Sequence, residues 1–235
     1  MLKADLHIHS FSCKRLTYLP FLYDSVQTVN QIIQGALDTG VQILAITDHD
    51  TLAGYKEAAR IVQSRGLDLV LIPGCEISSA DGHILAYNIE TEIPKGLTAA
   101  KTIQRIHDQG GYAVAAHPFL MGSLGNLVFE LPFDALEGFN AAVSLFANFK
   151  SIDAAEKLQL PYLANSDAHQ IEEIGRSHML FPENTQTTRE LFTHLHDGNF
   201  VCIHGRTNNL QLTWRHLYRN LQLHLRHGLP TPESR

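Results

Sequence analysis

The sequence predicts a single-domain α/β protein in which β/α units close, or nearly close, into a barrel. Short apolar runs alternate with helix-like stretches along most of the 235 residues. Strands that alternate with helices are typical of a parallel sheet covered on both faces. Six or more such repeats within about 200 residues fit a barrel better than an open sheet with two edges. No segment rich in Pro, Gly or Ser interrupts the pattern before Pro230, which favours one domain.

Apolar runs of strand length predict the strands. The fourth run is reached through Ala80-Asp81-Gly82, a composition typical of a tight turn. The expected strands cover residues 2–7, 41–47, 68–75, 83–88, 112–116, 135–139, 162–165, 177–181 and 200–204.

Apolar residues that recur with the 3.6-residue period predict the helices. Val29, Ile32 and Ile33 follow this spacing, and Gly40 then terminates the first helix. The expected helices cover residues 26–38, 52–65, 97–109, 141–158, 188–197 and 209–226. The last helix has an apolar side, so we expect it to pack on the barrel within a domain of residues 1–227. Residues 228–235 are expected to form a flexible tail, and residues 119–133 either a mobile lid or a wide turn.

Charge and composition exclude several classes of protein. The net charge is −6, from 18 basic and 24 acidic residues, which argues against wholesale binding to nucleic acid or to an anionic membrane. The longest apolar runs are strand-sized, far below the ~20 residues that span a bilayer, and the first residues lack an apolar signal core. Three cysteines make a disulfide framework improbable, so we expect a cytoplasmic protein. The oligomeric state is left open.

Histidine is the unusual feature, with 14 residues in the chain. In a parallel α/β fold, functional groups gather at the C-terminal ends of strands. His7 and His9 follow the first strand two residues apart, so they point to the same side of an extended chain. Imidazole or carboxylate groups lie at the ends of six of the predicted strands, with His83 at the start of the fourth: His7, His9, His49, Glu76, His83, His117, Asp167 and His169.

This set of side chains predicts a multinuclear metal site. Neutral imidazole and carboxylate suit Zn, Mn and Fe, and so many ligands exceed the needs of one four-coordinate ion. Glu76 has two oxygens and can bridge two ions. Two metals at ~3.5–4 Å from each other are suited to displacement at phosphorus, because they supply a hydroxide and stabilise the leaving oxygen.

The same residues occur in motifs that resemble those of the PHP (polymerase and histidinol phosphatase) family. The matching motifs are DLHIHS at 5–10, ITDHD at 46–50, PGCEI at 73–77, HIL at 83–85, AHP at 116–118 and SDAH at 166–169. The stretch FDALEGFN at 133–140 also resembles small stand-alone members, so the resemblance covers residues 2–182. It implies a distorted barrel of seven β/α units, two or three divalent ions, and metal ligation by all eight residues named above.

One part of the sequence departs from the family pattern. Members of the family carry an Asp shortly after the first motif, whereas the chain here has no acidic residue between Ser10 and Asp24. Three alternatives follow: Asp24 folds back to the site, Cys13 takes part, or one metal has fewer protein ligands.

Basic side chains near the motifs are candidates for contacts with a phosphate. Arg176 follows the last motif, Lys14 and Arg15 follow the first, and His178 could protonate a leaving group.

Two acidic residues of the second motif are assigned supporting roles. We expect Asp48 to orient a ligand imidazole and Asp50 to cap the helix that begins near Leu52.

The resulting prediction is a phosphoesterase that uses a metal-bound hydroxide on a small phosphomonoester, a nucleotide or a short oligonucleotide. The alternative, motivated by the missing Asp, is a catalytically weakened barrel that binds metal and phosphate as a regulatory module. A third reading, metal-dependent hydrolysis of a bond without phosphorus, rests on barrel analogy alone.

Overall fold

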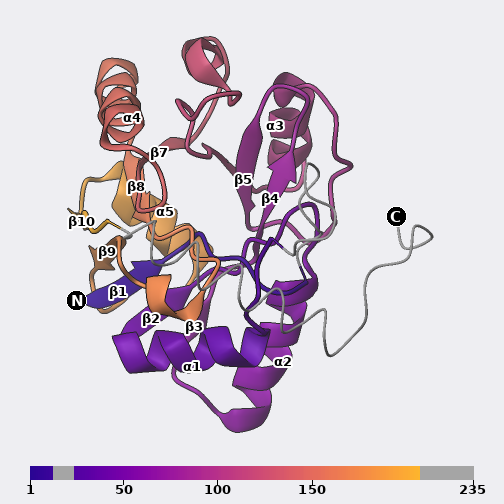
Figure 1. The fold of residues 1–235 in the computed structure, drawn as a ribbon, viewed down its shortest axis with the longest axis vertical. Coiled ribbons are helices and arrows are strands. Elements are labelled where there is room, and N and C mark those ends of the chain that lie inside the picture. Colours follow the sequence, from indigo (N-terminus) through magenta and orange to yellow (C-terminus); the bar gives the residue numbers. More distant parts are fainter. Residues whose placement is uncertain (13–23, 207–235) are drawn as a thin grey trace.

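The computed structural model describes residues 1–12 and 24–206, whose strands form two five-stranded mixed sheets (Figure 1). The strand orders are β10-β9-β1-β2-β3 and β4-β5-β6-β7-β8. The strands are β1 (Leu2–Asp5), β2 (Val41–Leu44), β3 (Val70–Leu71), β4 (Gly74–Ser78), β5 (His83–Tyr87), β6 (Tyr112–Ala115), β7 (Ala135–Asn140), β8 (Tyr162–Asn165), β9 (His178–Phe181) and β10 (Val201–Ile203). The helices are α1 (Val29–Thr39), α2 (Ala53–Arg65), α3 (Ala99–His107), α4 (Leu145–Leu158), α5 (Thr188–His196), η1 (Gly125–Phe129) and η2 (Ile171–Glu173).

The α/β class is confirmed, but a closed barrel of seven β/α units is not. Parallel pairing joins β1 to β2, β2 to β3, β6 to β7 and β7 to β8. In contrast, β5 runs antiparallel to both β4 and β6, and β9 runs antiparallel to β1 and β10. The expectation of a wholly parallel sheet is therefore wrong. A physical reason is visible between β4 and β5, because a four-residue connection is long enough for a hairpin but not for a crossover.

The predicted strand at 68–75 is two strands that belong to different sheets. The change occurs at Pro73, which has no N–H to donate to a sheet. Just before it, Ile72 N donates to Leu44 O at 2.9 Å; at the proline itself, the carbonyl accepts from Asn88 N at 2.8 Å. The chain thus leaves one sheet and enters the other at this residue.

Capping side chains set two helix starts later than the apolar pattern predicts. Thr28 and Gln31 form a capping box at the start of α1, and Ser144 Oγ accepts from Ala147 N at the start of α4. The predicted terminator Gly40 lies in the left-handed region, with φ 72°, at the end of α1. The predicted helix at 209–226 and tail at 228–235 lie outside the described residues, as does part of the domain predicted over 1–227.

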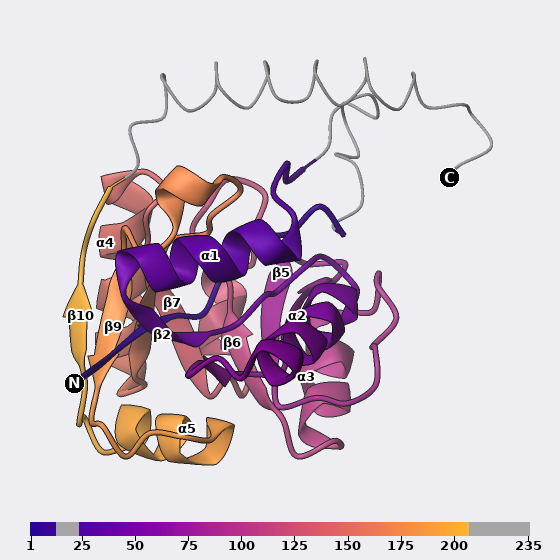
Figure 2. The same ribbon diagram turned by 90° about the horizontal axis from the view of Figure 1, so that it is seen from below.

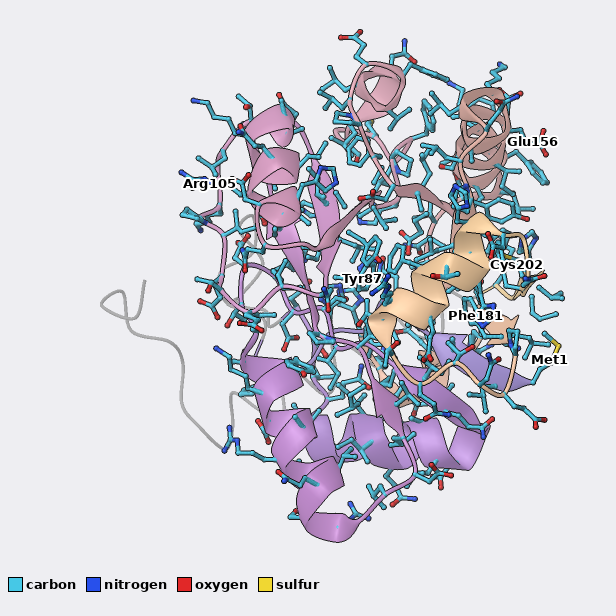
Figure 3. The ribbon with its side chains drawn as sticks, turned by 180° about the vertical axis from the view of Figure 1, so that it is seen from behind. Met1, Tyr87, Arg105, Glu156, Phe181 and Cys202 are labelled. Carbon is cyan, nitrogen blue, oxygen red and sulfur yellow. The ribbon has the colours of Figure 1, made fainter. Side chains whose placement is uncertain are left out.

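The two sheets face each other across a shared core, and isolated bridges connect the first sheet to both edges of the second, at β4 and just beyond β8. Apolar side chains from both sheets pack between them, and Tyr87, labelled in Figure 3, donates its hydroxyl to Leu6 O at 2.8 Å across the interface. Isolated parallel bridges pair Ile8 with Ala168 and His49 with Glu76, just beyond the C-terminal ends of β1, β8 and β2. These bridges bring strand ends of both sheets to one place.

Helices cover the outer faces of the sheets. One apolar cluster joins α1 and α2 to the first sheet, and another joins α3 and α4 to the second (Figure 2). At the other end of the strands, α5 packs against the first residues of β6, where Phe192 stacks on Tyr112 with ring centroids 3.8 Å apart. No helix in residues 1–12 and 24–206 is long and apolar enough to cross a bilayer.

Candidate metal centre

The structure brings all eight predicted ligand residues together where the two sheets meet. Potential ligand atoms within 4.8 Å of one another fall into overlapping groups that also include Asp24. Most of these side chains are buried, and His49, His83 and His169 are partly exposed. The eight side chains therefore lie next to one another, as their positions at the ends of the predicted strands indicate.

The first ligand group consists of His7, His9, Glu76 and Asp167. The Nε2 atoms of His7 and His9 are 3.1 Å apart. Glu76 Oε2 lies 3.3 and 3.2 Å from these two nitrogens, and Asp167 Oδ1 lies 3.4 and 3.3 Å from them. Ligands placed ~2.0–2.1 Å from a tetrahedral ion are separated by ~3.3–3.4 Å. His7, His9 and Glu76 have the spacing and chemistry expected around one divalent ion, and Asp167 lies within the same range of both imidazoles.

The second ligand group uses the other oxygen of Glu76. Glu76 Oε1 lies 3.0 Å from His83 Nδ1 and 3.0 Å from His117 Nε2. Its two oxygens thus face different sets of imidazoles, which is the arrangement expected of a carboxylate that bridges two ions.

The third ligand group explains the departure from the family pattern. Asp24 Oδ2 lies 3.3 Å from His169 Nε2 and 3.6 Å from His49 Nε2. Asp24 is buried among these imidazoles although it follows the first motif at a distance. Of the three alternatives, the placement of Asp24 favours the one in which it folds back to the site; Cys13 lies outside the described residues.

Electrostatics keep the central carboxylates charged. Burial raises the pKa of Glu76, but the imidazoles of His49, His83 and His7 lower it further, to well below its ordinary value. Burial and neighbouring imidazoles oppose each other in the same way at Asp167, whose pKa also lies well below its ordinary value. Both groups are ionised at neutral pH, as metal ligands must be.

A buried carboxylate that the sequence analysis did not single out lies behind the ligands. His7 Nδ1 donates to Glu137 Oε1 at 2.8 Å, and His117 N donates to Glu137 Oε2 at 2.9 Å. Asn140 Nδ2 and Asn165 Nδ2 donate to the same carboxylate, each at 3.0 Å. Such a partner fixes the tautomer and the orientation of a ligand imidazole. The signal in the sequence was a lone acidic residue within the apolar strand ALEGFN.

Asp48 contacts the first motif, and Asp50 does not cap α2 as expected. Asp48 accepts from Ser10 N at 2.6 Å and Ser10 Oγ at 2.7 Å, so it holds the first motif in place. Asp50 Oδ1 accepts from Ser78 N at 2.8 Å and does not cap α2. Glu92 accepts from Leu52 N at 2.9 Å at that helix start instead. A contact across the fold, which a local pattern cannot reveal, explains the difference at Asp50.

Two ligand residues adopt backbone angles that are uncommon for residues other than glycine. The φ angle is 28° at His117 and 52° at Asp167. Such residues persist when surrounding contacts hold them, and they cluster at functional sites. Here Glu137 holds the His117 amide, and Asn140 Nδ2 donates to Asp167 Oδ2 at 3.0 Å.

The predicted phosphate contacts are less closely connected to the ligand cluster. Arg176 is exposed and donates from Nε to Glu172 O at 3.0 Å. A hydrogen bond of 2.9 Å joins His178 Nδ1 to the carbonyl of Gly175. Lys14 and Arg15 lie outside the described residues. The roles of all four therefore stay predictions.

Comparisons with known proteins agree with this geometry. Residues 146–200 match the family model for PHP-associated sequences. An uncharacterised protein of Methanocaldococcus jannaschii is 38% identical over 144 residues, which are 60% of this chain and 82% of the relative. A two-domain protein from Bacteroides vulgatus, described as containing a predicted PHP-like metal-dependent phosphoesterase, has a similar fold: TM-score 0.69, 16% identity, covering 87% of this chain and 65% of that one.

Two enzymes are similar over a smaller part. The 5'-3' exoribonuclease Rnm of Salmonella typhimurium is 35% identical over 94 residues, 38% of this chain and 29% of the enzyme. The phosphoribosyl 1,2-cyclic phosphate 1,2-diphosphodiesterase of Eggerthella lenta is 31% identical over 110 residues, 44% of this chain and 37% of the enzyme. The chain thus spans only about a third of either enzyme.

The fold is similar to that of a protein described as a PHP-like metal-dependent phosphoesterase, and the two partial relatives, an exoribonuclease and a diphosphodiesterase, are hydrolases. The chain belongs to the PHP family.

Proposed function

We propose that this chain hydrolyses a phosphoester at a centre of two or three divalent ions held by the three ligand groups. The observation that carries the proposal is the position of Glu76, whose two oxygens face His7 and His9 on one side and His83 and His117 on the other. The two sheets would then be halves of a distorted barrel that meet at this centre. One domain over residues 1–227 and a cytoplasmic location are part of the same proposal.

Each group of residues has a distinct part in the proposed reaction. When bound, the ions lower the pKa of a water molecule and withdraw charge from the phosphoryl oxygens. Glu76 and Asp167 would hold the ions, and Glu137 fixes the orientation of the His7 ring through Nδ1. Imidazole and carboxylate ligands suit Zn, Mn or Fe. Arg176, Lys14 and Arg15 are proposed to neutralise phosphate charge, and His178 to protonate the leaving group.

The proposed substrates are a small phosphomonoester, a nucleotide or a short nucleic acid strand. The exoribonuclease and diphosphodiesterase relatives support phosphoesters of this range. The alternative of a regulatory binding module rested on a missing ligand, and the position of Asp24 beside His49 and His169 supports Asp24 as its replacement.

Hydrolysis assays on protein loaded with Zn, Mn or Fe test the proposal. We expect turnover of a phosphodiester or phosphomonoester that ceases with a chelator and returns with metal. Asp167→Ala should abolish turnover, because it removes a donor of the first ligand group, whereas the exposed Asp153→Ala should not. A metal-loaded wild-type protein without activity on any phosphoester would contradict the proposal and favour the binding module.

We expect Asp24→Asn to cost the protein one ion. The amide lacks the negative charge that attracts a cation beside His49 and His169. The third ligand group should therefore lose its ion, while the other two groups keep theirs. Elemental analysis of wild type and variant, loaded and desalted side by side, measures the difference. An unchanged metal content would show that Asp24 is not a ligand.

A further inference from the structure

An exposed aromatic surface lies on the first turns of α4. Phe146 and Phe149 are 71% and 63% exposed, and residues three apart share one face of a helix. Lys150 Nζ lies 5.0 Å from the ring centroid of Phe146 and 5.8 Å from that of Phe119. We call these four side chains the α4 platform. Large apolar groups this exposed and this close together are characteristic of a binding surface.

Hydrogen bonds tie the α4 platform to the candidate metal centre through β7. Asn148, in the same helix, donates from Nδ2 to Asn140 O at 3.0 Å and accepts from Asn140 N at 3.1 Å. Asn140 in turn donates to Asp167 Oδ2 at 3.0 Å. These side chains are buried, so they hold the start of α4 in a fixed position relative to the ligand Asp167.

A second connection runs through the loop after β6. Phe119 follows the ligand His117 by two residues, and Lys150 of α4 lies over its ring. The same loop carries η1, which packs beside α4 (Figure 1). The α4 platform is thus connected to two separate predicted ligands, to Asp167 through the hydrogen bonds of Asn140 and to His117 through the short sequence separation of Phe119.

We propose that the α4 platform stacks the bases of a single-stranded nucleic acid whose phosphodiester reaches the metal centre. The proposal rests on the proposed function and names the substrate class of that site. Phenyl rings offer base-stacking faces that do not depend on sequence, and a neighbouring ammonium group attracts the phosphate backbone. A small phosphomonoester without a base has no aromatic ring that could stack on the two exposed phenyl rings. Because the chain carries a net charge of −6, a polyanion is attracted to it only locally. Lys150, which lies over the Phe146 ring, supplies positive charge beside the aromatic faces.

The Phe146→Ala/Phe149→Ala double variant tests the proposal in the full-length protein. The probes are a short oligoribonucleotide and an abasic oligomer of the same length. We expect the ratio of kcat/KM between the two probes to fall about tenfold in the variant, the effect of losing one or two base stacks. Phe146→Tyr/Phe149→Tyr should restore the ratio because it keeps the aromatic faces. Leu37→Ala, which removes a half-exposed apolar side chain on α1, should leave the ratio as in wild type.

Binding without turnover separates the two proposals. A fluorescent oligoribonucleotide, titrated with wild type and the double variant in the presence of Ca²⁺, should bind about tenfold more weakly to the variant. Equal binding and an equal kcat/KM ratio would overturn the base-stacking platform even if the enzyme is active. A change of oligomeric state in the variant with no change in that ratio would identify the surface as a contact between copies and would also overturn it. A wild type that binds the probe but cleaves no phosphoester would instead refute the proposed function.

Discussion

Glu76→Gln should empty the metal centre and stop hydrolysis. Glu76 is buried, and its two oxygens contact imidazoles of both the first and the second ligand group. An amide nitrogen cannot ligate a cation and adds no charge, so neither ion keeps its bridging donor. We expect the loss of two ions per chain and a fall in kcat of about 10³-fold or more, since a two-metal clamp supplies several kcal/mol of charge stabilisation.

The matched control is Glu130→Gln, the same chemical change at an exposed residue outside the cluster. Circular dichroism and thermal unfolding of both variants show whether the fold survives, and elemental analysis with initial rates shows what the substitution does. Glu76→Gln with the metal content and kcat of wild type would exclude Glu76 as a bridging ligand.

Glu137→Ala should have the largest effect on stability. The substitution removes the acceptor of four buried donors: His7 Nδ1, His117 N, Asn140 Nδ2 and Asn165 Nδ2. Removing one partner from a buried charged network costs about 3–5 kcal/mol of the free energy of unfolding. The His7 ring also loses the partner that orients it, so we expect metal affinity to fall about 10–100-fold. Denaturant unfolding of metal-free protein and metal titration measure the two effects separately.

Glu137→Gln distinguishes the contribution of shape from that of charge. It fills the same volume and keeps one acceptor oxygen, so we expect a smaller loss of stability than for alanine, with metal affinity still reduced. If Glu137→Ala unfolded within about 0.5 kcal/mol of wild type, the size of an ordinary surface substitution, the buried network would not have the structural role assigned to it.

The gathering of the eight side chains at one place could be predicted from the sequence because it depends on local rules. A residue at the C-terminal end of a strand lies at that end of the sheet, and the two-residue spacing of His7 and His9 puts both side chains on the same face. Neither rule depends on how the strands pair. Helix bounds were correct to within a few residues where glycine or a capping side chain marks them, as at Gly40.

The remaining features depend on contacts between distant segments. The antiparallel hairpin of β4 and β5 and the change of sheet at Pro73 are tertiary choices that an apolar run does not reveal. Asp24 reaches the site from outside any motif, and Glu137 is recognisable only once His7 and His117 are seen to donate to it. A pattern of neighbours in sequence carries no information on such pairings.

The metal content of the wild-type chain tests the central claim most directly. Protein purified without chelators, loaded in turn with Zn and Mn and then desalted, would be measured by elemental analysis. The three ligand groups predict three ions per chain, with two as the content of a protein whose Asp24 group binds weakly. A content near zero that neither metal restores would contradict the account, because the buried histidines and carboxylates would then have another purpose.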